Sequence, residues 1–451
     1  MGAKQTAEPD VAVAVAADRS SESEEKQRRR VACATLVGTT IEWYDFLIYA
    51  QIAALLFGDL FFSGLGQWSQ LTALATAGVS FFFRPLGAIV SGYLGDRFGR
   101  RIVLVLTLGL MGVSTTLVGL LPTAAAIGIA APILLILLRC LQGLSAGGEW
   151  GGAAMLAVEH ARAGHRGRMG AFPQMGVPLG MMLAIVVMGA FNGLLGKAAF
   201  DAWGWRLPFL FSVVLVVVGQ YVRSKVAESP VFTELEESRT KAKTPLRDLL
   251  SAHRGKVLKA AATMVGNIAA GYMIVGGFAL AYVTSAHDLP RAHVLTLLFA
   301  ASAVWIGFTY VGAWWSDRSG RPVVYKAGYA MLFALLLPQF WLLSQGTALS
   351  VGVALLTLAV PLSLTYGPQS ALFAEMFPAR IRLSGASLAY AVGAVLGGAF
   401  APMIAEALTQ GFGTVLAVAP YLMGMALVSL VTAFFLTDRS GGPREEPTTS
   451  R

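Results

Sequence analysis

Charged residues are scarce in this chain. They make up 13% of its 451 residues, whereas hydrophobic residues make up 56%, and the mean hydropathy is +0.65. A soluble domain of ordinary composition carries about 25% charged residues. The composition therefore excludes a water-soluble globular protein and predicts a chain that buries its apolar surface in lipid.

Cysteine is nearly absent as well. Both cysteines, Cys33 and Cys140, lie inside apolar segments, so we expect thiols and no disulfide. The sequence also lacks a metal-ligand cluster, a glycine-rich phosphate loop and a Ser/His/Asp set in a suitable context, which predicts no metal, no cofactor and no enzymatic activity. The pI of about 9.6 does not predict nucleic-acid binding, because the basic residues lie in short loops between apolar runs.

Long apolar runs are what the chain has in abundance. Twelve of them come close to the roughly 20 residues that cross a bilayer, which predicts an all-α membrane protein. We expect the twelve transmembrane helices at residues 31–57, 70–94, 102–121, 132–157, 168–194, 205–223, 257–284, 292–314, 323–343, 348–374, 384–408 and 414–436.

The polar segments divide these helices into two halves. A charged connection follows the sixth span, and within it Pro230–Lys243 could form a surface amphipathic helix or remain a solvated linker. The predicted organisation is a disordered tail at 1–30, a six-helix half at 31–223, a linker at 224–256, a second six-helix half at 257–436 and a short tail at 437–451.

The positions of lysine and arginine predict the orientation. With both termini on one side, only Lys197, Arg206 and Arg291 fall on the other side, and Arg84 and Arg139 lie within spans. Basic residues collect on the cytoplasmic side of membrane proteins. We therefore expect a multi-pass protein of the plasma (inner) membrane with both termini in the cytoplasm.

A duplicated signature supports the two halves. Gly92–Arg101 reads GYLGDRFGRR, and Gly312–Arg321 reads GAWWSDRSGR; aligning Asp96 with Asp317 aligns the Asp-Arg-x-Gly-Arg residues that follow. A second pattern, Glu-x6-Arg, recurs at nearly the same offset, at Glu159 and at Glu375. Repeats on the scale of half a chain are typical of membrane transporters. In the second copy the leading glycine is displaced by one residue and Pro322 replaces the last basic residue, which predicts a smaller role for that copy.

These motifs resemble those of the major facilitator superfamily. The resemblance rests on Gly92–Arg101 and on Arg139-Cys-Leu-Gln-Gly143 in the fourth span. Three further motifs, Ile41-Glu-Trp-Tyr-Asp-Phe46, Arg84-Pro85 and Gly147-Gly-Glu-Trp150, resemble the metabolite:proton symporter branch. Members of that branch carry shikimate, 2-oxoglutarate, citrate or zwitterionic osmolytes, and the resemblance implies transport by alternating access.

The resemblance also implies a conformational latch at one membrane face. A solvated loop that obeys the positive-inside rule would explain the arginines but not the fixed spacing of glycine and aspartate. The predicted latch residues are Gly92, Asp96, Arg97, Gly99, Arg100, Arg101, Glu159, Arg166, Arg168, Asp317, Arg318, Gly320, Arg321, Glu375 and Arg382.

A second set of polar residues lies at mid-span depth, where charged side chains normally face a cavity or a partner. Glu42, Asp45 and Tyr49 share one face of the first span because of their helical spacing. The predicted substrate and proton pathway consists of Glu42, Asp45, Tyr49, Arg84, Arg139, Gln142 and Glu149. An arginine would face an anionic substrate and a carboxylate would bind the proton; the alternative is a set of structural ion pairs between helices. In the later spans, cavity-lining or structural roles are open for Asn267, Tyr272, Tyr366, Gln369 and Tyr390.

The predicted function is import of a small organic acid (shikimate-, keto- or di/tricarboxylate-like) together with a proton. The partners would be the acid, the proton and the bilayer, and a monomer would suffice because the cavity lies between two halves of one chain. Alternatives are a proton symporter of an osmolyte such as betaine or proline, an exporter on the same fold, and a nutrient receptor that binds without turnover.

Overall fold

The structure, a computed structural model, describes residues 8–238, 245–275 and 277–437. Regular secondary structure in these ranges is helical, and 12 segments are long and apolar enough to cross a membrane. The predicted all-α architecture with twelve spans is confirmed. The predicted tails fall partly outside the described residues, at 1–7 and 438–451.

The first half supplies six spans, which are α1, α3, α4, α6, α7 and α9. Short helical segments connect them on the side away from the linker. The elements are α1 Glu8–Ile52, η1 Ala53–Phe57, α2 Gly58–Phe61, η2 Ser63–Trp68, α3 Ser69–Phe98, α4 Arg100–Leu120, α5 Ala124–Ile127, α6 Ala130–Glu159, α7 Arg166–Leu195, α8 Lys197–Ala199, η3 Phe200–Gly204 and α9 Arg206–Ser224.

The second half repeats this plan with more broken helices. Its elements are α12 Arg254–Ala262, α13 Val265–Val275, α14 Phe278–Ala286, α15 Arg291–Ser319, α16 Arg321–Ser344, α17 Ala348–Tyr366, α18 Gln369–Met376, η4 Ala379–Ile381, α19 Arg382–Gly398, α20 Ala401–Phe412, η5 Val415–Ala417 and α21 Val418–Phe434.

The break between α19 and α20 has a clear local cause. Pro402 lies in the first turn of α20, and α19 ends four residues earlier, at Gly398. A proline has no N–H to donate and its ring clashes with the carbonyl group four residues before it, so the helix cannot run straight through. The span predicted at 384–408 is therefore two helices in the structure.

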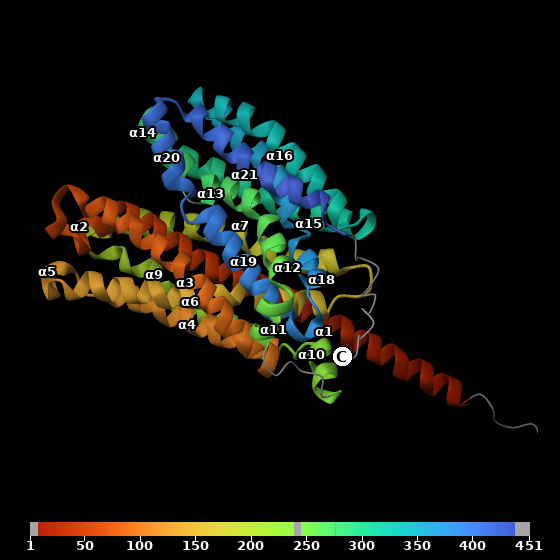
Figure 1. The fold of residues 1–451 in the computed structure, drawn as a ribbon. Coiled ribbons are helices and arrows are strands. Elements are labelled where there is room, and N and C mark those ends of the chain that lie inside the picture. The colour runs from red at the N-terminus through yellow and green to blue at the C-terminus, as the bar shows by residue number, and fades with distance from the viewer. Residues whose placement is uncertain (1–7, 239–244, 276, 438–451) are drawn as a thin grey trace, which may run out of the picture.

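Helix α1 begins earlier than the predicted span. The structure extends it back to Glu8, into the tail for which the sequence predicted disorder. Ion pairs at helical spacing support the extension: Arg28 pairs with Glu24 at 3.2 Å and with Glu25 at 3.3 Å. Figure 1 shows this part of α1 projecting beyond the bundle.

The linker carries two short helices, α10 (Pro230–Glu237) and α11 (Pro245–Ala252). Phe232 of α10 and Leu249 of α11 are buried, so the linker is packed against the bundle at these two points. Glu228 accepts hydrogen bonds from the backbone N–H groups of Arg100 (2.9 Å) and Arg101 (3.1 Å), which caps the start of α4. Helix α10 covers the first part of the segment Pro230–Lys243, for which the sequence left a helix or a solvated linker open. Residues 239–243 of that segment lie outside the described residues.

The two halves meet along a few helix pairs. Helix α3 packs on α19, α7 packs on α15, and α6 and α7 both contact α18. In Figure 1 the two groups come closest at the end that carries α10, α11 and α12, and spread toward the end that carries α2, α5 and α14. We call the first of these the latch end, because Asp96 and Asp317 lie there.

Candidate functional site

A carboxylate without a basic partner lies inside the first half. Asp45 of α1 is 0% exposed. Its Oδ1 accepts a hydrogen bond from Ser212 of α9 (2.5 Å), and its Oδ2 accepts one from Thr115 of α4 (2.9 Å). In the described part of the chain, no lysine or arginine lies within 4 Å of it. A buried charge is costly unless it is paired, so this carboxylate is chemically suited to bind and release a proton.

Asp45 is joined to Arg139 through neutral side chains. Gln142 donates to Thr115 at 2.8 Å and accepts from the Nη1 atom of Arg139 at 2.7 Å. The other donors of Arg139 bond to oxygens of α3, and its guanidinium lies over the ring of Tyr49, 3.8 Å from the centroid. The structure thus joins Asp45 to Gln142 and Arg139 through hydrogen bonds and places the Tyr49 ring against Arg139. That these residues form a pathway stays a prediction.

Glu149 and Glu42, the other two acids of the predicted pathway, have different hydrogen-bond partners from Asp45. Glu149 of α6 forms an ion pair with Arg223 of α9, and it also accepts a hydrogen bond from Thr107 at 2.6 Å. Arg223 is the last residue of the predicted sixth span, and no sequence signal indicated this partner. Glu42 is buried in α1, and its Oε2 has no hydrogen-bond partner. Of the two, Glu42 has the less satisfied carboxylate.

The pairing of Glu149 leads to a stability prediction. Replacing Glu149 by glutamine leaves Arg223 buried without a counter-charge, which typically costs about 3–5 kcal/mol. We expect the purified variant to unfold at a clearly lower temperature, and a Glu149→Gln/Arg223→Gln double variant to recover part of the loss. Unchanged thermal stability together with lost proton-driven transport would instead place Glu149 in the proton pathway.

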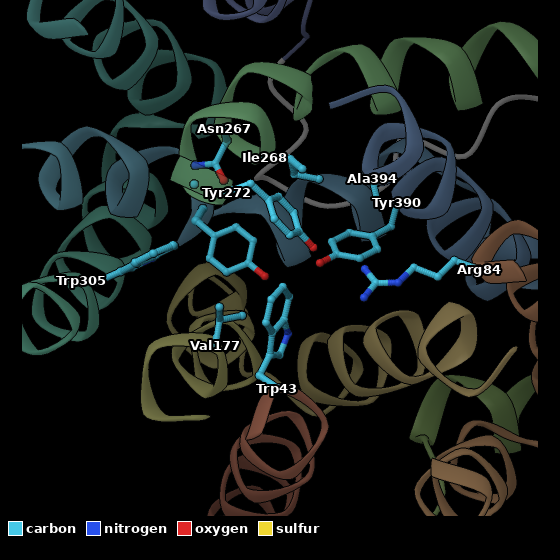
Figure 2. Close-up of a pocket in the computed structure, with 11 residues that line it drawn as sticks. Trp43, Arg84, Val177, Asn267, Ile268, Tyr272, Trp305, Tyr390 and Ala394 are labelled. Atoms are coloured by element: carbon cyan, nitrogen blue, oxygen red, sulfur yellow. The ribbon is translucent and has the colours of Figure 1, made fainter. Parts of the chain in front are cut away.

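A small cavity lies between the two halves (Figure 2). Its volume is about 30 Å³, which is room for little more than one or two water molecules in this conformation. Helices of both halves contribute its lining, which consists of Trp43, Arg84, Val177, Asn267, Ile268, Gly271, Tyr272, Trp305, Tyr366, Tyr390 and Ala394. Of the polar residues noted in the later spans, Gln369 is the one not in this lining.

Arg84 is the charged side chain of the cavity. It is 3% exposed, and its guanidinium lies over the rings of Phe81 (4.3 Å) and Phe46 (5.3 Å). No carboxylate of the described residues lies within 4 Å of it, and its Nε has no hydrogen-bond partner. Figure 2 shows the guanidinium directed at the cavity beside Tyr390. A desolvated guanidinium that forms no ion pair with the described residues is a ready site for an anionic group.

An aromatic and amide cluster connects the halves next to the cavity. The rings of Trp150 (α6) and Tyr390 (α19) stack with centroids 4.1 Å apart and planes at 10°. Trp150 donates to Gln174 at 2.6 Å, and Gln174 donates to the carbonyl oxygen of Tyr366 at 3.0 Å and to Gln369 at 3.3 Å. Tyr390 therefore belongs both to the cavity wall and to the contact between halves.

The first copy of the signature caps a helix of the other half. The Asp96 carboxylate at the end of α3 accepts from the backbone N–H groups of Leu383 (3.3 Å) and Ser384 (2.9 Å) at the start of α19. Arg100 pairs with Asp96 at 3.4 Å and with Glu159 at 3.2 Å. Carboxylates stabilise helix N-termini, so this contact holds the halves together at the latch end.

The second copy makes the mirrored contact. The Asp317 carboxylate at the end of α15 accepts from the N–H groups of Gly167 (2.7 Å) and Arg168 (3.0 Å) at the start of α7. Arg321 pairs with Asp317 at 2.7 Å and with Glu375 at 3.1 Å. The altered glycine and Pro322 do not prevent this copy from reproducing the geometry of the first.

In the second copy the glycine at the helix contact lies on the partner helix, α7, and not on α15. A Cβ atom on Gly92 of α3 would lie 2.7 Å from the Cα atom of Ser384, so glycine is needed for the close approach of α3 and α19. Ala313 stands at the matching position of α15. There the glycine is Gly167 on α7, where a Cβ atom would lie 2.6 Å from the carbonyl oxygen of Ala313.

The remaining predicted latch residues lie around these two caps. Gly99 (φ 113°) and Gly320 (φ 85°) break the helices behind each aspartate with backbone angles that favour glycine. Arg382 of the second half pairs with Glu159 of the first at 3.0 Å, whereas no Arg166–Glu375 pair occurs among the described residues. The Arg168 side chain also pairs with Asp317 of the other half, at 3.3 Å. Arg97 lies over Tyr93, Arg101 bonds to the carbonyl oxygen of Ser224, and Arg318 lies over Trp314.

The caps lead to a prediction about conformation. Replacing Asp96 or Asp317 by alanine removes both the acceptor oxygens and the charge at a helix N-terminus. A lost cap costs about 0.5–2 kcal/mol, or a factor of about 2 to 30 in a two-state equilibrium. Ser387 is buried between α19 and α6. We expect a Ser387→Cys side chain to react faster with a maleimide when either cap is removed than when both caps are intact. Arg97→Gln is the control, and equal labelling in all variants would contradict the latch.

The comparisons with known proteins agree with this architecture. The family model described as Major Facilitator Superfamily matches residues 31–402. The chain is 40% identical to the inner membrane metabolite transport protein YhjE of Escherichia coli, over 91% of this chain and 94% of that protein. It is 37% identical to the shikimate transporter of the same organism, with the same two coverages. It is 33% identical to the ectoine/proline transporter ProP of Corynebacterium glutamicum, over 93% and 86%.

A solved structure shares the fold. The proton:xylose symporter XylE bound to 6-bromo-6-deoxy-D-glucose superposes with a TM-score of 0.72 at 17% identity, covering 91% of this chain and 95% of that one. The family match, the relatives and the twelve spans lead to one conclusion: the chain belongs to the Major Facilitator Superfamily and is a multi-pass transporter of the plasma membrane.

Proposed function

We propose that this transporter carries a small organic acid into the cell together with a proton, by alternating access. The observation that carries the proposal is Arg84, a buried guanidinium that faces a cavity between the two halves and has no carboxylate partner within 4 Å among the described residues. A buried guanidinium that is held in no ion pair favours an anion. The relatives named as metabolite and shikimate transporters support this substrate class.

Asp45 is the proposed proton carrier. It is fully buried, bound by two hydroxyl groups and far enough from basic side chains to leave its charge uncompensated. Protonation removes that charge, and the chain Asp45–Thr115–Gln142–Arg139 links it to the helices that line the cavity. Glu42 is the second candidate, because its carboxylate is buried with an unpartnered oxygen.

The latch end is proposed to face the cytoplasm, with both termini there. The basic residues of the loops support this orientation. The Asp96 and Asp317 caps hold the two halves together at this end. The cycle would break both caps to release the acid and proton inward.

A zwitterionic osmolyte is the second candidate substrate. Five aromatic side chains line the cavity, and aromatic faces attract quaternary ammonium groups. The similarity to the ectoine/proline transporter supports this candidate.

Uptake into proteoliposomes distinguishes these proposals. The panel is shikimate, 2-oxoglutarate, citrate, an aromatic acid, betaine and proline, each with and without an inward proton gradient, corrected for protein-free vesicles. We expect gradient-driven accumulation of a carboxylate. Accumulation of betaine or proline would favour an osmolyte as the substrate. Binding without accumulation would favour a receptor. Movement of the substrate out of the vesicles while protons move in would favour an exporter.

A further inference from the structure

The charge inventory of the cavity limits the substrate to one carboxylate. Arg84 is the one cation among the lining residues, and the lining contains no acid. The second mid-membrane arginine, Arg139, already donates to Gln142, Ser80 and the carbonyl oxygens of Thr76 and Ala77. A second carboxylate on the substrate would therefore be desolvated with no cation to receive it, which is strongly unfavourable.

The walls of the cavity are suited to a flat apolar body. Trp43 of the first half and Tyr272 of the second lie with ring centroids 6.4 Å apart, and Trp305 and Tyr366 are also 6.4 Å apart. Figure 2 shows Trp43, Tyr272 and Tyr390 between Arg84 at one side of the cavity and Trp305 at the other. Because both halves supply these rings, a ring-shaped ligand can enter when the halves separate and be enclosed when they close.

A donor without a partner lies at the end of the cavity away from Arg84. The indole Nε1 of Trp305 is buried, with the residue 3% exposed, and it donates to no group of the described residues. An indole N–H can only donate, so it requires an acceptor oxygen. Buried donors are nearly always satisfied, and in a transport cavity the substrate can supply the acceptor.

We propose that the substrate is a cyclic monocarboxylate that carries a hydroxyl or keto oxygen at the end of the ring away from its carboxylate. The carboxylate binds Arg84, the ring packs between Trp43 and Tyr272, and the distal oxygen accepts a hydrogen bond from Trp305. Trp305 is thus a specificity-determining residue. This assignment rests on the proposed function as an acid transporter and narrows its substrate class.

Calorimetric binding to the purified full-length protein tests the assignment without interference from passive leak. The probes are benzoate, 4-hydroxybenzoate, terephthalate, which has a second carboxylate in place of the hydroxyl, and glycine betaine. We expect 4-hydroxybenzoate to bind about tenfold more tightly than benzoate, and terephthalate and betaine to bind at least about tenfold more weakly than 4-hydroxybenzoate.

A matched pair of variants separates specificity from packing. Trp305→Phe is expected to weaken binding of 4-hydroxybenzoate about tenfold and to leave benzoate within about twofold, because only the hydroxylated ring uses the indole N–H. Trp341→Phe, at an exposed position of α16, should change neither. Benzoate binding also reports that the variant is folded.

Each failure has a distinct meaning. Equal weakening of both benzoates by Trp305→Phe overturns the specificity role, and preferred binding of terephthalate or betaine overturns the monocarboxylate class. A dicarboxylate that accumulates under a proton gradient would leave acid symport standing while this inference fails. Tight binding of 4-hydroxybenzoate without gradient-driven accumulation would support this inference and contradict symport.

Discussion

Replacing Arg84 by glutamine is expected to lower transport of the acid by about a hundredfold or more. A charge-assisted contact to a desolvated carboxylate is worth about 2–5 kcal/mol, and 1.4 kcal/mol corresponds to a factor of ten. Arg84 has no carboxylate partner in the described protein, so its removal breaks no ion pair of the fold. The loss should therefore appear in substrate affinity and uptake, with little change in thermal stability.

Lysine at position 84 sharpens this test. Arg84→Lys keeps the positive charge but loses the planar guanidinium, so we expect partial uptake, between those of the wild-type protein and Arg84→Gln. Arg291→Gln, at the start of α15, removes a positive charge outside the cavity and is the control. Wild-type uptake by Arg84→Gln would show that the anion binds elsewhere and would overturn the proposed site.

Replacing Asp45 by asparagine is expected to abolish proton-driven accumulation while leaving substrate exchange largely intact. Asparagine mimics the neutral acid and has a similar shape. Its carbonyl oxygen can accept from one of the two hydroxyls, Ser212 or Thr115, and the other hydroxyl can turn to accept from its NH₂ group. The variant should thus fold, bind substrate and change conformation, but carry no proton.

Exchange of external labelled for internal unlabelled acid measures the retained activity. We expect gradient-driven accumulation by Asp45→Asn to fall to the level of protein-free vesicles, whereas exchange is retained because it requires no net movement of protons. Glu42→Gln is the matched variant on the same helix face. Accumulation retained by Asp45→Asn but lost in Glu42→Gln would move the proton site to Glu42.

The sequence predicted the features that depend on local pattern. Span length and hydropathy predicted the twelve transmembrane segments, and repeated spacing predicted that Asp96 and Asp317 have matching positions. Helical spacing also predicted that Asp45 and Tyr49 share a face, and both belong to the network around Arg139. These properties depend on neighbours within one helix or on repetition along the chain, which a single sequence records.

Partners across helices could not be predicted in the same way. The pairing of Glu149 with Arg223, the hydroxyl partners of Asp45 and the position of Trp305 in the cavity depend on how each helix is rotated about its axis and tilted against its neighbours. Small residues such as Gly38, which leaves space for the Arg223 side chain, help to set that geometry, and a single sequence does not indicate which of 50 glycines do so.

The central claim, that acid and proton move together, is tested most directly by the pH inside proteoliposomes. The transported acid is added outside at equal pH on both sides, with a pH-sensitive dye inside and protein-free vesicles to correct for passive entry. Because coupling is reciprocal, the inward acid gradient should drive protons inward, and the lumen should acidify with the wild-type protein but not with Asp45→Asn. Entry of labelled acid through the wild-type protein without acidification beyond the control would contradict proton symport.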